Sequence, residues 1–281
     1  MRFGGNIRFA EITPQYLRDF ESWLLNMENS RSRTTVGMYA TSMRTVMNEA
    51  IYQGIIKKDD NYPFGKRKYL IPKSRNIKKA LRPSEITAIF QYDPESEPER
   101  KAKDFWFFIY NGNGMNPRDV AALKYKDIHG EFLTFTRTKT EFTTRHDPIL
   151  ITAYITEDIQ RTIDTWGNKD TSPDNYVFPI LQKDFSPLRT YEVVQLIFAF
   201  VNKWMTKIVT SLGFEAKKGK TSVCRHSFAT RTRNAGASNA LVKDLLGHHN
   251  LGTTDNYLAS FENEVIKEFA LKLRENKGGI I

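Results

Sequence analysis

Three short segments near the C-terminus carry most of the information in this sequence: Arg225-His226-Ser227-Phe228-Ala229-Thr230, Leu245-Leu246-Gly247-His248-His249 and Thr253-Thr254-Asp255-Asn256-Tyr257. Taken singly, their residue types say little. An arginine is usually a surface or salt-bridged residue, a histidine after a Leu-Leu-Gly turn is usually a helix C-terminal cation, and any one of twelve tyrosines is usually a core or interface residue. Their order and spacing set them apart, because Tyr257 follows His248 by nine positions.

The chain as a whole has the composition of a globular, basic protein. Its 281 residues suffice for one large domain, or for a small domain followed by a catalytic one of about 200 residues. Hydrophobic residues make up 40% and aromatic residues 12%, which is enough for a buried core and excludes a disordered chain. The net charge of +10 and the pI near 9.5 favour a polyanionic partner, either nucleic acid or an anionic membrane surface, with simple solubility as the alternative.

Cysteine usage and hydropathy indicate the compartment. The single Cys224 excludes an internal disulfide framework and a cysteine-rich zinc site, and it suits a reducing cytosol. No apolar run approaches the roughly 18 residues needed to span a bilayer. The segment from Met1 to Asn6 lacks the apolar core of a signal peptide. We therefore expect a soluble, cytoplasmic protein with no membrane partner.

The first 55 or so residues predict a small all-helical unit. Thr13 and Pro14 form a helix start, with a capping hydroxyl before a proline at the first helical position. A second helix is predicted from about Ser32 to Gln53. Its expected apolar face consists of Val36, Tyr39, Met43, Val46, Met47, Ala50 and Ile51.

A basic stretch from Lys57 to Arg82 follows this helical unit. Pro63, Gly65 and Pro72 break any long helix there, so the stretch is interpreted as a connector between two domains. A solvated linker is the plain interpretation, and a connector that follows a phosphate backbone explains the charge better. The residues expected to contact DNA are Lys66, Arg67, Lys68, Lys73, Arg75, Lys78 and Lys79.

A second, larger unit is predicted from Pro83 onward. The run from Phe105 to Tyr110 is apolar on every side, which is typical of a buried helix, and Asn111-Gly112-Asn113-Gly114 ends that helix. Between Phe132 and Ile151, two runs of strand-forming residues flank a polar stretch, which predicts a small antiparallel sheet with a polar tip. The chain after Glu157 is largely helical, so the expected fold class is mainly α with a small antiparallel β-sheet.

The three C-terminal segments resemble the motifs of tyrosine recombinases of the phage-integrase type. The segments Pro72-Lys73-Ser74, Ala80-Leu81 and Asn113-Gly114-Met115-Asn116 are most similar to integrases of mobile elements in Bacteroides-type bacteria. The resemblance implies a helical, SAM-like core-site DNA-binding domain over residues 1–75, with the connector running to about 82. It also implies a catalytic domain over residues 83–281, ending in a C-terminal interaction helix.

The resemblance assigns a role to each residue of the three segments. Tyr257 is implied as the nucleophile that forms a 3′-phosphotyrosine, a role for which a phenol needs help to lose its proton. Arg225 and His248 are implied as ligands of the scissile phosphate, since a planar guanidinium supplies paired, permanently charged donors. Lys139 matches the hairpin lysine of the family, which is the expected general acid for the departing 5′ oxygen.

Two positions depart from the family pattern. The family has a histidine three residues before the second arginine, and here that residue is Ser222, which is expected to hydrogen-bond the phosphate. The first arginine of the pattern falls on Asn116. Arg118 is the predicted substitute, with Arg137 and Arg145 as the next candidates. The remaining supporting residues are Asp119, at the acidic position of the pattern, and His226, expected to pack nearby.

The resemblance also implies partners and a cofactor requirement. The phosphotyrosine conserves the bond energy, so no cofactor, neither ATP nor a metal, is expected, and His248 and His249 lack carboxylates at ligand spacing. The expected partners are double-stranded DNA recombination sites, a homo-tetramer held together on DNA by the last helix, and DNA-bending or excision accessory proteins. That helix, from about Glu262 to Glu275, would otherwise complete the core of its own monomer. An arm-binding domain ahead of the helical unit stays open.

Two alternatives to a recombinase remain from the sequence. A topoisomerase of type IB shares the phosphotyrosine chemistry but relaxes supercoils. A non-catalytic or regulatory DNA-binding relative is consistent with the altered positions Asn116 and Ser222.

Overall fold

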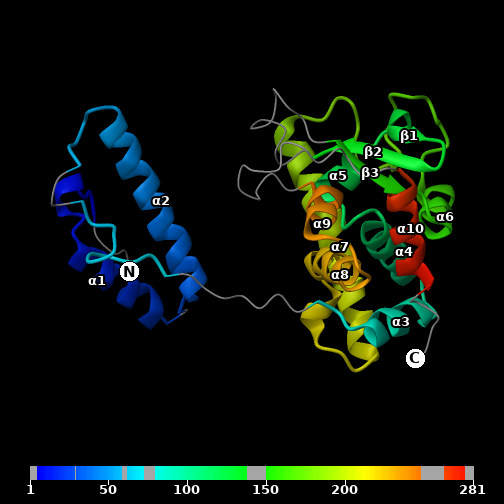
Figure 1. The fold of residues 1–281 in the computed structure, drawn as a ribbon, viewed down its shortest axis with the longest axis horizontal. Coiled ribbons are helices and arrows are strands. Elements are labelled where there is room, and N and C mark those ends of the chain that lie inside the picture. Colours follow the sequence, from blue (N-terminus) through cyan, green and yellow to red (C-terminus); the bar gives the residue numbers. More distant parts are fainter. Residues whose placement is uncertain are drawn as a thin grey trace. The chain divides into compact units, whose positions relative to one another are not determined.

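The structure is a computed structural model, which describes residues 5–28, 30–58, 62–72, 80–137, 150–247 and 263–275. The chain divides into two compact units, residues 1–77 and 78–281 (Figure 1). The first unit contains the short helix η1 (Phe9–Glu11) and the helices α1 (Pro14–Asn26) and α2 (Arg33–Tyr52). Both predicted helices are therefore present: α1 begins at the predicted proline, and both ends of α2 lie within a residue of the predicted ones.

The core of the first unit is small, and it corrects the expected apolar face of α2. Val36 and Met47 are buried, but Tyr39 is 47% and Val46 58% exposed. Among the described residues, the core against α2 is formed by η1 with Ile12, by α1 and by the segment up to Pro72, so the buried stripe of α2 is narrower than the apolar pattern suggests. The approach is close, because a Cβ at Gly37 would lie 2.4 Å from the carbonyl oxygen of Pro72.

The basic stretch is partly integrated into this first unit. Phe64 and Tyr69 are buried in its core, and the Tyr69 hydroxyl donates to Glu21 at 2.9 Å. The turn between them presents Lys66 and Arg67 to solvent. Part of the predicted connector is thus a folded loop, anchored by two aromatic side chains.

The second unit is built from eight α-helices among its described residues. The long helix α7 packs against α4, and α8 and α6 also pack against α4. Every residue from Phe105 to Tyr110 is buried, as the apolar run predicts. The helices are α3 (Pro83–Gln91), α4 (Glu97–Asn111), α5 (Pro117–Ala122), α6 (Glu157–Trp166), α7 (Pro187–Ser211), α8 (Thr221–Asn234), α9 (Asn239–Leu246) and α10 (Asn263–Glu275), with the short helices η2 (Tyr125–Asp127) and η3 (Ala216–Gly219).

A three-stranded antiparallel sheet lies at one end of this unit (Figure 1). Its order is β1 (Ile128–His129), β2 (Phe132–Thr136), β3 (Leu150–Tyr154), with Leu133 opposite Ala153 in the central pair. The predicted antiparallel pairing is confirmed for the described residues, in which β3 begins at Leu150, whereas the predicted start at residue 148 lies outside them. The fold class, mainly α with a small antiparallel sheet, is confirmed as well.

Helix α7 corrects one statement made from the sequence. It is 25 residues long, and an 18-residue window within it reaches a mean hydropathy of 1.2, so by length and composition it is able to cross a membrane. A single helix of this kind is weak evidence for a membrane protein, since core helices of globular domains pass the same test. One side of α7 supplies core residues, including Phe198, Val201 and Met205.

The last helix, α10, packs against the sheet and α8 of its own chain (Figure 1). Ile266 and Leu273 are buried in the main core. Lys267 pairs with Glu131 at 3.1 Å on the same face. In the single chain, α10 therefore completes the core of its own unit, the simpler of the two interpretations left open by the sequence.

Candidate active site

Helix α8 carries Arg225 and is fixed to three other parts of the second unit. Its first residue, Thr221, donates its backbone N–H to the side chain of Asn202 on α7 at 2.9 Å. The Ser227 hydroxyl accepts the backbone N–H of Leu81 at 2.8 Å, and Cys224 Sγ lies 3.3 Å from the carbonyl oxygen of Trp106. These contacts bury one side of α8 and set the direction in which Arg225 leaves it.

The guanidinium of Arg225 joins two turns that are distant in sequence. Nη1 donates to the carbonyl oxygen of Gly114, and Nη2 donates to that of Leu246 at 2.7 Å. Burial, followed by the charge of Arg137, lowers the pKa of Arg225 to about 10, while Asp119 acts in the opposite direction. The group is still fully charged at neutral pH.

The turn after α4 is shaped to receive Arg225. Asn113 and Gly114 have φ values of 57° and 64°, and the Asn113 side chain donates to the carbonyl oxygen of Thr152 on β3 at 2.8 Å. A Cβ at Gly114 would lie 2.9 Å from Cγ of Arg225. Glycine is therefore required here for both its positive φ and the close approach.

Arg137, immediately after β2, lies beside Arg225. Its Nη1 donates to the carbonyl oxygen of Gly247 at 2.9 Å, one residue beyond the carbonyl that Arg225 contacts. Gly247 ends α9 in the left-handed conformation, with φ 61°. A Cβ there would lie 2.8 Å from Cδ of Arg137, so this glycine, too, permits the approach of an arginine. The two guanidinium groups thus hold the end of α9, directly before His248.

The structure brings some of the other predicted residues to this cluster. Asp119 is 4% exposed and acts electrostatically on Arg225. Ser222 is exposed and precedes Arg225 by three residues on the same helix, which places both on one face. His226 is partly buried on α8.

Arg118 is exposed near the start of α5. The Asn116 side chain caps this helix, accepting the backbone N–H of Arg118 at 3.0 Å. The charged groups that shift the pKa of Arg225 include Arg137 and Asp119.

Several predicted residues lie outside the part of the chain that the structure describes. They are Tyr257, His248, Lys139 and Arg145 from the site, and Lys73, Arg75, Lys78 and Lys79 from the basic stretch. Within the described residues, no group of three or more His, Cys, Asp or Glu side chains is arranged to hold a metal ion.

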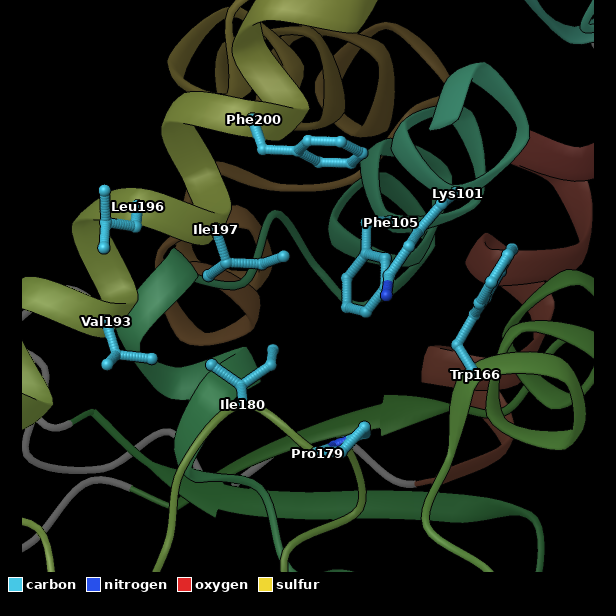
Figure 2. A pocket seen from close by; sticks show the side chains of 9 residues that line it. All are labelled: Lys101, Phe105, Trp166, Pro179, Ile180, Val193, Leu196, Ile197 and Phe200. Atoms are coloured by element: carbon cyan, nitrogen blue, oxygen red, sulfur yellow. The ribbon is translucent and has the colours of Figure 1, made fainter. Parts of the chain in front are cut away.

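An apolar cavity of about 340 Å³ lies elsewhere in the second unit (Figure 2). Figure 2 shows side chains from α4, α7 and the 179–180 segment around it, with Trp166 on the far side. Lys101 supplies one cation, 5.1 Å from the Trp166 ring centroid. Among the described residues, the lining of this cavity includes no predicted site residue, and Lys101 is its one cationic side chain.

Sequence reasoning underestimated two residues of the cluster. Arg137 was only a second choice for the missing arginine, and Gly114 was interpreted only as a helix breaker. The Asn-Gly-Asn-Gly repeat carried a signal for Gly114, because adjacent residues with positive φ often mark a site of close approach. No local signal marks Arg137, whose contact with Gly247 spans 110 residues.

Comparisons with known proteins agree with this arrangement. The Phage integrase family matches residues 79–264, and the Phage integrase SAM-like domain matches residues 2–69. A tyrosine recombinase of Pseudothermotoga lettingae is 24% identical over 262 residues, covering 92% of this chain and 82% of that protein.

Two solved structures share the fold at low identity. An integrase of the Tn1549 transposon in complex with transposon right end DNA superposes with a TM-score of 0.61 at 17% identity, covering 96% of this chain and 88% of that one. A lambda integrase dimer bound to a COC′ core site superposes with a TM-score of 0.58 at 16% identity, covering 100% of this chain and 86% of that one. Since the family match spans most of the chain, the protein belongs to the phage integrase family of tyrosine-type site-specific DNA recombinases.

Proposed function

We propose that this recombinase cuts and rejoins DNA with Tyr257 as its nucleophile and Arg225 as the central ligand of the scissile phosphate. The observation that carries the proposal is the position of Arg225. Its guanidinium is largely buried, remains charged, and lies at the meeting point of the α4–α5 turn, the end of β2 and the end of α9. A charged group held in this way is a preorganised donor for an oxyanion.

The reaction follows from the residue types. The Tyr257 hydroxyl loses its proton to solvent and its oxygen attacks phosphorus, so that a Tyr257–phosphorus ester bond forms and the bond from phosphorus to the 5′ oxygen breaks. Lys139 gives its proton to that oxygen, which leaves as a 5′-hydroxyl. The 5′-hydroxyl of a second strand then gives its proton to the neutral Lys139 and attacks the phosphotyrosine; the phosphorus–Tyr257 bond breaks, and Tyr257 leaves and takes a proton from solvent. Each step exchanges one phosphoester for another, so no cofactor enters it.

The remaining site residues support the phosphate. His248 is the next residue after Leu246 and Gly247, whose carbonyl groups accept from the two arginines. From this position in the sequence, its proposed role is to donate a hydrogen bond to the same phosphate. Ser222 supplies a hydroxyl on the face of α8 that carries Arg225, and buried Asp119 offsets part of the positive charge. His226 packs alongside.

The proposal extends to the DNA partners and the assembly. Lys66, Arg67 and Lys68, together with Lys73, Arg75, Lys78 and Lys79, are proposed to contact the phosphate backbone on either side of the cut. A lambda integrase tetramer bound to a Holliday junction has a similar fold, with a TM-score of 0.54. We propose a tetramer on DNA in which α10 moves from its own β3 to a neighbouring subunit, in the cytoplasm of a bacterium, with DNA-bending or excision proteins as accessories.

Covalent trapping tests the proposal directly. In a duplex that carries the recombination site and a nick a few nucleotides to the 3′ side of the cleaved phosphate, cleavage releases the short fragment that bears the 5′-hydroxyl, and without this fragment the phosphotyrosine cannot be reversed. The wild-type chain is expected to accumulate a covalent complex on denaturing gels, and Tyr257→Phe to accumulate none. Tyr191→Phe is the matched control, because Tyr191 is 62% exposed on α7 and belongs to no proposed site.

The same substrates distinguish the alternatives. A non-catalytic relative binds the duplex but traps nothing on any site sequence that it recognises. A topoisomerase traps the nicked strand and relaxes supercoiled plasmid, but does not transfer strands between two duplexes. Joining of strands from two duplexes, lost in Tyr257→Phe, is the result expected of the recombinase.

A further inference from the structure

The family pattern has two arginines, and in this sequence only the second of them, Arg225, is present at its position. The structure nevertheless has a second guanidinium in the site, that of Arg137. Asn116 occupies the position of the first arginine, and its side chain is engaged in capping α5. The guanidinium of Arg137 acts electrostatically on Arg225 and lowers its pKa. Arg137 directly follows β2, so it comes from a different part of the fold from α5.

The two arginines share a common orientation. Arg225 donates to the carbonyl oxygen of Leu246 at 2.7 Å and Arg137 to that of Gly247 at 2.9 Å. These carbonyl groups are consecutive, so the two cations converge on one short stretch of backbone. Carbonyl oxygens carry partial negative charge, and at the end of a helix they are acceptors without an intrahelical partner.

The charge of the cluster favours an anion. Arg225 and Arg137 repel each other, and this repulsion contributes to the lowered pKa of Arg225. Asp119 offsets one of the two positive charges, which leaves the cluster with an excess of one. The neutral carbonyl groups accept hydrogen bonds from the arginines but do not offset their charge. A phosphodiester does both, with two non-bridging oxygens for two planar donors.

From this geometry we infer that Arg137 supplies the second guanidinium for the scissile phosphate, in place of the arginine that is missing at Asn116. In the absence of DNA, the two arginines donate hydrogen bonds to the Leu246 and Gly247 carbonyl groups, and the phosphate replaces these carbonyl groups as the acceptor when DNA binds. The inference rests on the proposed function, because it concerns the same phosphate. It differs from the sequence-based expectation, which gave this role to Arg118.

Removing a charge from the cleaved phosphate distinguishes a phosphate-binding role of Arg137 from a purely structural one. A methylphosphonate at the cleaved position has one neutral methyl group in place of a charged oxygen, so its transition state needs less positive charge. Single-turnover cleavage is measured for the wild type and for Arg137→Ala on the phosphodiester and on the methylphosphonate, with duplex affinity by fluorescence anisotropy.

On the phosphodiester, Arg137→Ala is expected to cleave at least about 100-fold more slowly than the wild type, as for the loss of one oxyanion donor. On the methylphosphonate, the deficit is expected to shrink to less than about 10-fold, with affinity changed little. Arg137→Lys is expected to be intermediate, because lysine keeps the charge but not the planar fork. Arg189→Ala is the matched control, since it removes an exposed arginine of α7.

Other results would overturn the inference. Equal losses on both substrates would make Arg137 a positioning residue that holds the end of α9. Wild-type cleavage by Arg137→Ala would remove it from the reaction, and a methylphosphonate-dependent deficit in Arg118→Ala alone would give the role to Arg118. A wild-type chain that cleaves neither substrate would instead refute the proposed function, and the inference with it.

Discussion

Arg225 and Arg118 both lie near the start of a helix, in the two regions where the sequence predicts phosphate-binding arginines, but their surroundings differ. Arg225 contacts carbonyl groups 111 and 21 residues away, and one side of its helix is fixed to α7, to Leu81 and to α4. Arg118 is exposed, and its backbone N–H reaches the side chain of Asn116, two residues away. Among the described residues, tertiary contacts hold the guanidinium of Arg225, whereas the hydrogen bond described for Arg118 lies within its own turn.

The difference shows what a motif cannot specify. A guanidinium becomes a useful phosphate ligand when its orientation is fixed before the substrate arrives, because binding then costs little side-chain entropy. That orientation comes from long-range contacts such as those of Arg225 and Arg137. An exposed arginine keeps its rotamer freedom and loses it only on binding.

Gly114→Ala is expected to have the largest effect on the well-held side. The new alanine would have to keep φ 64°, and its Cβ would lie 2.9 Å from Cγ and 3.1 Å from Cα of Arg225. Left-handed strain and overpacking together are expected to lower the free energy of unfolding by about 3 kcal/mol. Cleavage is expected to fall at least about 10-fold, as the guanidinium is displaced. Urea denaturation and covalent trapping measure the two effects.

Gly130→Ala is the matched control for this substitution. Gly130 has φ 57°, but its Cβ would meet nothing within 4 Å. Only backbone strain of about 1 kcal/mol is expected there, with wild-type cleavage. Equal losses in the two variants would mean that the space beside Arg225 is not tight, which would contradict the account of the well-held arginine.

Lys218→Met tests the anchoring of α8 with a smaller expected effect. Lys218 precedes α8 and pairs with Glu85 of α3, a carboxylate that is only 2% exposed and also accepts from Arg82 at 2.8 Å and 3.0 Å. Removing one of the two cations is expected to cost about 2 kcal/mol at pH 7. Lys267→Met, which removes an exposed cation facing Glu131, is the control expected to stay close to the wild type.

The stability difference between Lys218→Met and the wild type is also expected to depend on pH. Burial raises the pKa of Glu85, but hydrogen bonds from Lys218 and Arg82 outweigh it and hold the pKa below the usual 4.5. The carboxylate therefore stabilises the fold above that value and loses its contribution as the pH falls through the lower, folded pKa. The gap between Lys218→Met and the wild type is expected to narrow below about pH 4. A gap that widens in acid would contradict the ion-pair explanation.

The sequence predicted the local structure well, and it did so where a few neighbouring residues determine the conformation. The caps at Thr13 and Ser32 mark the observed starts of α1 and α2, since each side chain accepts a backbone N–H three residues later. The Asn-Gly-Asn-Gly segment ends α4 for an equally local reason, two successive residues with positive φ. The family, too, follows from short motifs in one region of the chain.

The arrangement of the site was less predictable, because it depends on contacts between distant segments. Which arginine lies beside Arg225 is decided by the register of β2 with β3 and by the end of α9, neither of which a motif encodes. The exposed faces of Tyr39 and Val46 escaped prediction for a related reason: apolar periodicity does not reveal how many elements cover a helix. The roles of Tyr257, His248 and Lys139 stay predictions.

Arg118→Ala is expected to have the smallest effect, and it is the most direct challenge to the comparison. Because its guanidinium is exposed, the free energy of unfolding is expected to change by less than about 0.5 kcal/mol. Cleavage is expected to stay within about fivefold of the wild type, and any lost phosphate contact to appear as a salt dependence of binding reduced by about one ion. Single-turnover cleavage and anisotropy titrations at several salt concentrations measure both. A loss of cleavage beyond about 100-fold with unchanged affinity would mean that the exposed Arg118, once DNA orders it, replaces the family arginine that is missing at Asn116.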